Sequence, residues 1–593
     1  MQPGTSARST PTPTPPPAKV AQRERRHDSE PTKQTPKRHT PQVKTVVASG
    51  VAEVLLDRPK ALNALTTTMV QALRRLYARW DDAAAAAARG AAGGESAVGA
   101  VVLRAAPSIR DRAFCAGGDV KDVVRAAREG RVREAQAFFE HEYACDWAIG
   151  GPLARDLSRA RPSAAAAGAG PRPPPVAVPL RVALVDSVVM GGGVGLSLHG
   201  HAVVATERTV WAMPEVAIGI QPDVGVVARL MATTGGKGGK GGGGGGKGGH
   251  AAGGDASSSS SSPLHGGLLT PRVGLWLALS GARVGGGALR ALGLATHCAP
   301  AASLDAAVAA LRRRQRELAD EQRQQQRGRR GGGGNAHPPP LGLAGDPAAL
   351  SAVLAEFEFA SEAEADAAAE RAARQKAVPA AAPPAMTARE LRARLPLIEA
   401  AFGAGDARQQ QGDPGGAVAA IVAALRAAAE GRSHADIGGA RGGGAPASQL
   451  LPPALQPAAM ACPEARRFAA ETAAAIASGS AFAAAVTLEH ARRSRGLGLR
   501  EALVADYSLA ARFCSGERGD MWEGVRARLV DRGRPGTAPP RWAYARPEDV
   551  PAAEVRAMFE PPHPDAARAL RAAGIVASGE EEDDRAAGGR ARL

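Results

Sequence analysis

Residues 190–225 read MGGGVGLSLHGHAVVATERTVWAMPEVAIGIQPDVG, and they are the most informative segment of the chain about its fold. An apolar run, Val182–Val185 and then Val188–Met190, leads into three glycines, and Val194–Leu198 after them is apolar again. This pattern predicts a strand, a tight turn and the start of a helix. Such a turn leaves backbone N–H groups facing whatever lies above it.

Two carboxylates follow the glycine turn. Glu215 and Asp223 stand eight residues apart, and each is next to a proline. Free N–H donors near paired carboxylates suit chemistry on a carbonyl whose oxygen becomes negative. Taken singly, a glycine turn is usually only a turn and a Pro-Glu pair only a loop, so the hypothesis requires a second donor.

A second glycine turn lies upstream and supplies that donor. After a predicted strand at Val98–Arg104 the chain reads Arg112-Ala113-Phe114-Cys115-Ala116-Gly117-Gly118-Asp119, and a helix is expected from about Val120. The chain therefore has two glycine turns, each placed between a strand and a helix.

Composition excludes several classes of function. Gly 72, Pro 45 and 3% aromatic residues in 593 indicate a core interrupted by low-complexity inserts. The net charge is +16, and residues 1–50 alone hold nine Lys/Arg against three Asp/Glu. No basic stripe is interleaved with aromatics, so direct nucleic-acid binding is not expected. No apolar run approaches the length of a membrane helix, so no membrane partner is expected.

The five cysteines show no CxxC or CxxH spacing, so we expect reduced intracellular thiols and neither a disulfide framework nor a metal site. The Gly-Gly-Lys repeats near residue 240 lack the Ser or Thr that would follow the lysine of a phosphate-binding loop.

Periodicity predicts the order of elements. Residues 1–43 are expected to be disordered, Lys44–Asp57 to form a hairpin around Ser49-Gly50, and a helix to present Met69, Leu73, Leu76, Tyr77 and Trp80 on one face. Further helices are predicted at Phe138–Ile149, Val273–Leu279, Ala288–Leu292, Glu464–Ser478, Ala481–Arg492, Leu499–Phe513 and Met521–Leu529. An Ala/Gly insert is expected near 83–95. Disordered inserts are expected at about 150–175, 235–262, 322–340 and 403–448, the last with a weak helix at Ala417–Ala429.

These elements divide the chain into a disordered segment (1–43), a catalytic core (44–300), a low-complexity, partly helical region (301–463), a helical region expected to cover the core (464–562) and a tail (563–593).

Six short motifs in the same order resemble the crotonase (enoyl-CoA hydratase/isomerase) superfamily, and within it the 3-hydroxyisobutyryl-CoA hydrolase family. They are Arg58-Pro59-Lys60-Ala61-Leu62-Asn63-Ala64-Leu65, Ala113–Asp119, Phe138-Phe139-Glu140-His141-Glu142-Tyr143, Met190–Ser197, Met213-Pro214-Glu215 and Pro222-Asp223-Val224-Gly225. Near the end of the chain, Trp522–Arg526 fits the closing helix of the family. Each motif is weak alone, and together they are specific.

The resemblance implies an α/β fold, a crotonase-like spiral of ββα units with a C-terminal helical region, that binds an acyl-CoA thioester. The thioester oxygen would lie between the N–H groups of Gly118 and Gly192, where glycine permits close approach of the substrate. Lys60 and the Ala64 carbonyl would lie near the adenine and phosphates of CoA, and Ala116 and Asp119 would also line the substrate site. No cofactor is implied, since CoA is part of the substrate.

The resemblance also implies the reaction. Hydratases of this superfamily use two glutamates, and the position of one of them is Gly195 here, which disfavours hydration. Glu215 would attack the thioester or activate water, Asp223 would position the substrate hydroxyl or the water, and Glu142 would bind the substrate or support Glu215. This is hydrolysis of a short 3-hydroxyacyl-CoA, such as 3-hydroxyisobutyryl-CoA in valine degradation.

The sequence departs from the family in places. Ser187 replaces a small residue or glycine. Val226 and Val227 replace glycines and are expected to narrow or deform the acyl pocket. His199 and His201, beside the glycine turn, are interpreted as structural.

Two other functions stay open at this point: an enoyl-CoA isomerase or hydratase, and a non-catalytic mitochondrial ribosome subunit of hydrolase descent, which the pI of about 10.3 would suit. The final Ala591-Arg592-Leu593 resembles a peroxisomal signal, with a mitochondrial location as the alternative. The sequence does not determine the oligomeric state.

Overall fold

The structure is a computed structural model that describes residues 41–88, 98–160, 178–232, 267–329, 342–344, 346–375, 385–431, 462–516, 519–532, 534, 536–560, 563, 566–572 and 574–575. The predicted disorder of residues 1–40, most of the predicted inserts at 150–175 and 235–262, and the C-terminal tripeptide fall outside this description. Residues 42–593 form one unit, and the strands and helices below belong to it.

The described strands form two sheets. The first contains β1 (Val43–Ala48), β2 (Val51–Leu56), β3 (Ala100–Ala105), β5 (Leu180–Val185), β7 (Ala202–Ala205) and β10 (His297–Cys298), in that order. The second contains β4 (Ala113–Cys115), β6 (Val188–Met190), β8 (Val210–Ala212) and β9 (Val284–Gly285). β1 and β2 are antiparallel across Ser49 and Gly50, which both have positive φ, so the predicted hairpin is confirmed.

Strands alternate between the sheets along the chain. β3, β5 and β7 are parallel neighbours in the first sheet, and each is followed by β4, β6 or β8 in the second. Helix α2 (Val120–Arg128) follows the first such pair and α4 (Gly192–Leu198) the second. This is the predicted α/β spiral of ββα units. The apolar run 182–190, expected as one strand, is two strands of different sheets, separated at Ser187, whose φ is +67°.

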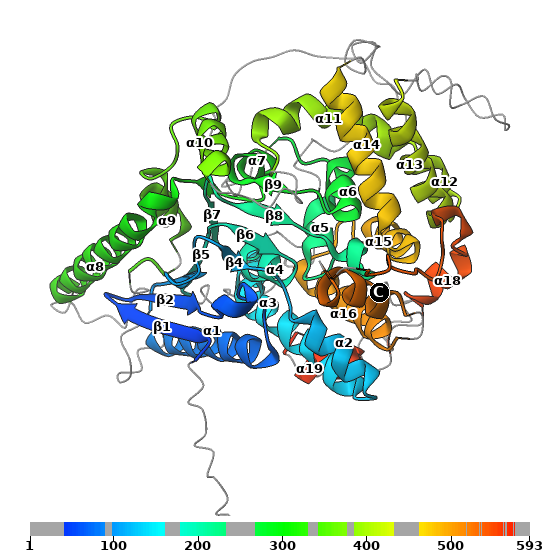
Figure 1. The fold of residues 1–593 in the computed structure, drawn as a ribbon. Coiled ribbons are helices and arrows are strands. Elements are labelled where there is room, and N and C mark those ends of the chain that lie inside the picture. The colour runs from blue at the N-terminus through cyan, green and yellow to red at the C-terminus, as the bar shows by residue number, and fades with distance from the viewer. Residues whose placement is uncertain are drawn as a thin grey trace, which may run out of the picture. The chain divides into compact units, whose positions relative to one another are not determined.

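The first sheet is covered on both faces, as parallel sheets usually are. Val102, Leu184 and Val204 pack with α8 (Leu304–Arg329) and α9 (Pro347–Ala355), whereas Val101 and Ala183 join the main core with α1 (Thr67–Ala88). Figure 1 shows α8 and α9 beside the sheet, away from the C-terminal helices. Part of the region expected to be low-complexity thus completes the core.

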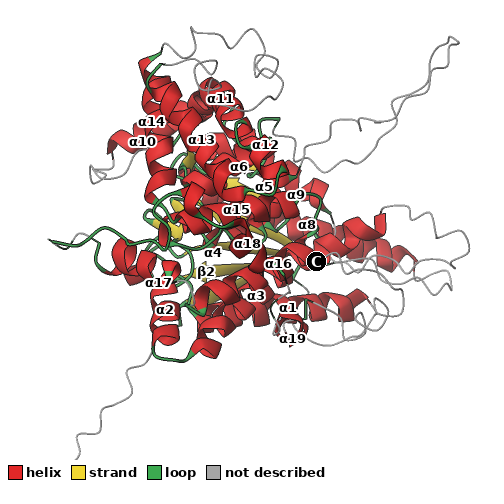
Figure 2. Cartoon of the chain, turned by 90° about the vertical axis from the view of Figure 1, so that its right-hand side faces the viewer, coloured by secondary structure: helices red, strands yellow, loops and turns green. Residues whose placement is uncertain are grey.

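The remaining helices surround the strands (Figure 2). They are α3 (Val132–Ala160), α5 (Val226–Met231), α6 (Pro271–Ser280), α7 (Gly286–Leu292), α10 (Glu362–Gln375), α11 (Ala388–Gly403), α12 (Asp406–Gln410), α13 (Pro414–Ala429), α14 (Pro463–Ser478), α15 (Ala481–Arg493), α16 (Leu499–Cys514), α17 (Asp520–Val525), α18 (Ala552–Ala557) and α19 (Ala566–Ala572). Short 3-10 helices lie at Pro59–Ala61 and Glu215–Ile218, and a π-helical turn at Arg526–Val530.

Four of the predicted inserts are partly wrong. Residues 83–88 belong to α1, residues 150–160 continue α3 through Pro152, and residues 322–329 belong to α8. Residues 406–429 form α12 and α13, and α13 buries Val418, Ile421 and Leu425. The alanine-rich segments 83–88 and 414–429 form helices because alanine has the highest helix propensity, and α13 also buries an apolar face. The division of the chain at residues 300 and 463 stays a prediction.

All five cysteines lie in the described residues and are free thiols. Among the described helices, none is by itself long and apolar enough to cross a membrane; α14 and α15 reach that length and apolarity only as a pair bent by 105°.

Candidate active site

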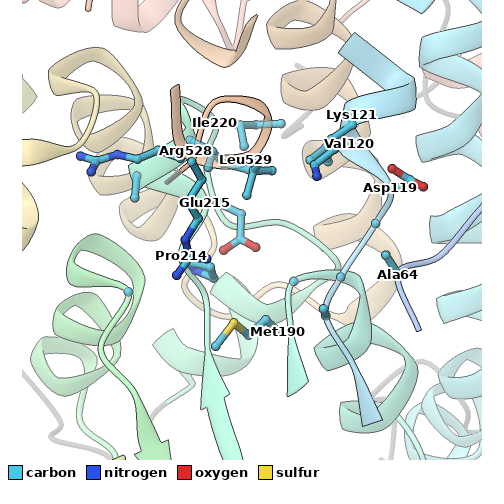
Figure 3. A pocket seen from close by; sticks show the side chains of 18 of the residues that line it. Ala64, Asp119, Val120, Lys121, Met190, Pro214, Glu215, Ile220, Arg528 and Leu529 are labelled. Atoms are coloured by element: carbon cyan, nitrogen blue, oxygen red, sulfur yellow. The ribbon is translucent and has the colours of Figure 1, made fainter. Parts of the chain in front are cut away.

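A cavity of about 1550 Å³ lies over the carboxyl ends of β4 and β6. The nine residues predicted to bind or act on a substrate all line it: Lys60, Ala64, Ala116, Gly118, Asp119, Glu142, Gly192, Glu215 and Asp223. In Figure 3 the Glu215 carboxyl points into the cavity, with Ala64 and Asp119 on one side. The structure thus brings the predicted set together, and the role of each residue stays a prediction.

The two glycine turns meet because β4 and β6 are parallel neighbours. Gly117 and Gly191 have φ of +101° and +48°, a region that favours glycine. A Cβ on Gly117 would lie 3.2 Å from the Met190 carbonyl oxygen and 3.7 Å from the Gly192 nitrogen. The backbones of the two turns are therefore in contact, with no room for a side chain between them.

Among the described residues, no backbone carbonyl outside the helices and strands accepts from the N–H of Gly118 or Gly192. The bridge between Leu65 and the second turn uses the Gly117 carbonyl and the Asp119 N–H, and leaves out the N–H of Gly118. Gly192 is the first residue of α4, so its N–H has no acceptor within the helix. Two such donors beside one cavity form the pattern of an oxyanion hole.

Two buried glutamates face these turns. A Cβ on Gly192 would lie 2.0 Å from Glu142 Oε1, and a Cβ on Gly191 would lie 2.9 Å from Glu215 Oε1. Glu142 is 2% exposed and Glu215 8%. Within the described residues, Glu142 Oε1 and Glu215 Oε2 have no hydrogen-bond partner. Buried carboxyl oxygens without protein partners mark where water or a substrate group can bind.

Asp223 is the third carboxylate of the site, beside Glu142 and Glu215. Its Oδ2 accepts a 2.6 Å hydrogen bond from the hydroxyl of Tyr143, which is fully buried. Burial raises the pKa of Asp223 to about 6, against the lowering effect of the Tyr143 hydrogen bond. Burial and the nearby Asp223 raise the pKa of Glu215 well above its ordinary value. Both carboxylates are therefore stronger proton acceptors than exposed carboxylates.

A further carboxyl lies behind the site. A Cβ on Gly195 would be 2.7 Å from Asp146 Oδ2 and 2.8 Å from Val224 Cβ. This position therefore has no space for the second glutamate of a hydratase. Among the described residues, no group of three or more His, Cys, Asp or Glu is arranged to hold a metal ion.

The opposite side of the cavity is polar. Arg58 donates to the Ala64 carbonyl at 2.8 Å and to Asp119 Oδ2 at 2.7 Å. Arg58 thereby ties the predicted CoA-binding segment to the second glycine turn. The Ala64 carbonyl retains one lone pair for a ligand.

Two expectations about the cavity are wrong. Val226 and Val227 do not narrow it, because they begin α5 and lie in the core. The C-terminal helical region does more than cover the core, because its π-helical turn contributes Arg528 and Leu529 to the lining (Figure 3). The sequence carried a signal here, since the turn directly follows the family-like Trp522–Arg526 motif, but the motif does not show which side chains face inward.

The sequence matches the Enoyl-CoA hydratase/isomerase family over residues 51–151, 178–240 and 453–559. It is 31% identical to the mitochondrial 3-hydroxyisobutyryl-CoA hydrolase of Danio rerio, across 41% of this chain and 44% of that protein. It is 33% identical to the Xenopus laevis protein of the same name, across 42% and 45%. The chain thus spans less than half of the length of these relatives.

The fold is similar to that of a solved structure, a carnitinyl-CoA dehydratase from Mycobacterium thermoresistibile. The two are 25% identical, with a TM-score of 0.50, over 88% of this chain and 98% of the other. The matched sequence segments contain both glycine turns, all three site carboxylates and the π-helical turn.

Proposed function

This chain belongs to the enoyl-CoA hydratase/isomerase family, and we propose that it hydrolyses a short 3-hydroxyacyl-CoA thioester, with 3-hydroxyisobutyryl-CoA as the substrate. One observation carries the proposal: Glu215 and two glycines whose N–H groups can serve as donors, Gly118 and Gly192, line a single cavity. The names of the relatives support the choice of acyl group.

In the proposed reaction Glu215 takes a proton from water, and the hydroxide attacks the thioester carbonyl. The carbonyl oxygen becomes an anion and accepts from the N–H groups of Gly118 and Gly192, each worth about 2.7–4 kcal/mol in the transition state. Collapse of this intermediate breaks the C–S bond, and protonated Glu215 returns its proton to the CoA thiolate. The products are the free acid and CoA.

Burial and the nearby Asp223 raise the pKa of Glu215, so its carboxylate takes a proton from water more readily than an exposed glutamate would. Asp223 would hold the substrate hydroxyl or the attacking water. Glu142, whose pKa is raised by burial and by Asp223, Asp146 and Glu215, would bind the substrate or support Glu215.

The test is release of free CoA, followed with a thiol reagent, from 3-hydroxyisobutyryl-CoA, 3-hydroxypropionyl-CoA and crotonyl-CoA. We expect Glu215→Gln to lower kcat by about 10²–10⁴-fold, the usual contribution of a general base. Glu140→Gln is the matched control, because it removes a carboxyl of α3 outside the cavity. Hydration or isomerisation of crotonyl-CoA without CoA release would refute hydrolysis. Inactivity on every thioester would favour a non-catalytic protein.

Location within the cell stays a prediction. The animal relatives carry the word mitochondrial in their names, whereas Ala591-Arg592-Leu593 resembles a peroxisomal signal. A fluorescent fusion at either end of the chain, with and without these three residues, separates the two destinations.

A further inference from the structure

The turn that carries Asp223 has a backbone shape that its sequence does not favour. The Val226 N–H donates to the Asp223 carbonyl at 3.0 Å, and the two residues between them, Val224 and Gly225, have φ of +53° and +73°. Two positive φ values in succession characterise a type I′ turn, which prefers glycine, asparagine or aspartate. Val224 is β-branched and fully buried, so the surrounding structure must hold it in this conformation.

Three side chains from separate parts of the chain hold this turn. Tyr143 of α3 donates to the Asp223 carboxyl at 2.6 Å. His199, at the end of α4, lies with its Nε2 2.7 Å from the Val224 carbonyl oxygen. Asp506 of α16 accepts from the Gly225 N–H at 2.6 Å. Each of three successive residues of the turn therefore has one side-chain partner.

The chemistry of these partners suits a fixed clamp. Burial lowers the pKa of His199 to about 4, so the ring is neutral and its Nε2 must carry the hydrogen that the carbonyl accepts. Asp506 is 1% exposed, and its second oxygen lies 3.2 Å from His490 Nε2. Leu499 and His199 close the space over Gly225, where a Cβ would lie 2.8 Å from Leu499 Cδ1. A side chain at position 225 would therefore have to displace Leu499 or His199.

We propose that His199, Tyr143 and Asp506 form a clamp that holds the Asp223 turn in its strained shape and thereby positions Asp223 toward the cavity. They are positioning residues, since His199, Tyr143 and Asp506 do not line the cavity. The inference rests on the proposed function in one respect: Asp223 must act on the substrate. It also gives the C-terminal helices a role in catalysis, because Asp506 reaches the turn from 281 residues away.

The test compares Asp506→Ala, which removes the acceptor, with Asp506→Asn, which retains an acceptor oxygen. Ser508→Ala is the matched control, because it removes a hydrogen bond of the same helix, to the Val504 carbonyl, away from the turn. Amide exchange of the segment containing Gly225 is measured by mass spectrometry, together with kcat and KM.

We expect Asp506→Ala to accelerate exchange at Gly225 and to lower kcat by about 10–10²-fold, as for a slightly misplaced group, with little change in KM. Asp506→Asn should keep both the exchange at Gly225 and kcat close to the wild-type values, and Ser508→Ala should resemble the wild type. Equal exchange and equal kcat in Asp506→Ala and Ser508→Ala would overturn the clamp. If Asp506→Ala fails to fold, His199→Leu against the donor-retaining His199→Gln decides by the same readouts.

The exchange arm separates the two proposals. If the wild type releases no CoA from any thioester, the proposed function fails, and the exchange of Gly225 still reports whether the clamp exists. If the wild type is active and exchange changes while kcat does not, the turn is held as described but positioning of Asp223 is refuted.

Discussion

Gly192 shows how a single residue limits what the site tolerates. Alanine would suit the first turn of α4 by propensity, yet a Cβ there would lie 2.0 Å from Glu142 Oε1 and 3.2 Å from Leu65 Cδ1. Relief of this clash must displace Glu142 or the N–H donor. We therefore expect Gly192→Ala to lower kcat/KM by about 10²–10³-fold, the usual cost of losing one such donor. Gly267→Ala, which has open space, is the control. Equal activity of the two variants would contradict the oxyanion hole.

Removal of the Tyr143 hydroxyl should shift the pH dependence of kcat/KM. Asp223 must be ionised to accept from the substrate hydroxyl or the water, and its pKa is about 6, so kcat/KM should fall as the pH drops through that value. The Tyr143 hydrogen bond favours the ionised form. Its removal in Tyr143→Phe should raise the pKa of Asp223 further and move the acid limb to higher pH. Tyr77→Phe removes a buried hydroxyl elsewhere and should leave the limb in place. An unmoved limb in Tyr143→Phe would show that Asp223 does not limit the rate.

The sequence could predict those site residues that lie within short motifs. Glu215, Asp223 and the two glycines are of this kind, and the structure places all of them at the cavity. Their partners could not be predicted, because Tyr143 is 80 residues from Asp223 and Asp506 is 281 residues from Gly225. One sequence gives no means of pairing positions so far apart.

Among the elements, α13 shows why composition is a poor guide to disorder. Its alanine-rich sequence resembles the inserts around it, although Asp413 and Pro414 supply a helix start signal. Asp413 accepts from the Gly416 N–H at 2.8 Å, and Pro414 occupies the first helical position. The helix also buries an apolar face. The helix start signal and this face together stabilise α13 despite its low-complexity sequence.

The contact between α1 and β5 gives a prediction at the scale of elements. Arg181 of β5 is 2% exposed, and its Nη2 lies 2.6 Å from both carboxylate oxygens of Asp81 in α1. Asp81→Ala would leave the guanidinium buried without this partner, which should reduce the free energy of unfolding by about 3–5 kcal/mol. Guanidinium denaturation measures the change. The neighbouring Asp82 is exposed, so Asp82→Ala should stay within about 0.5 kcal/mol of the wild type. If Asp81→Ala reduced the free energy of unfolding by less than about 0.5 kcal/mol, water would be able to take the place of the Asp81 carboxylate beside Arg181.

At the scale of the whole molecule, the cavity depends on segments from the entire chain. The core contributes the glycine turns, and the C-terminal region contributes Arg528 and Leu529 to the lining and Asp506 to the turn behind it. The site is therefore complete only when the N-terminal spiral and the C-terminal helices pack together.

This assembly buries five carboxyls whose pKa values are all raised, chiefly by burial: Glu142, Asp146, Glu215, Asp223 and Asp506. A raised pKa means that the folded state holds its proton while the unfolded state has lost it. The free energy of unfolding therefore falls as the pH rises from the pKa of these carboxyls in the unfolded state to their pKa in the folded state. The neutral histidines His199, His201 and His490, half-buried or buried, act in the opposite sense. The pKa of His199, His201 and His490 is lowered to about 4, so stability falls as the pH drops below about 6.5.

Asp223→Asn should separate stability from activity. The pKa of Asp223 rises from 3.8 to about 6, which corresponds to about 3 kcal/mol of destabilisation above pH 6. Asparagine keeps an oxygen for the Tyr143 hydroxyl and carries no charge. The variant should therefore resist guanidinium better than the wild type at pH 8, lose this advantage near pH 4, and release CoA far more slowly. The exposed Asp320→Asn on α8 should show neither effect. If Asp223→Asn were less stable than the wild type at pH 8, the surroundings would stabilise the Asp223 carboxylate. The charge needed for catalysis would then not reduce the stability of the fold.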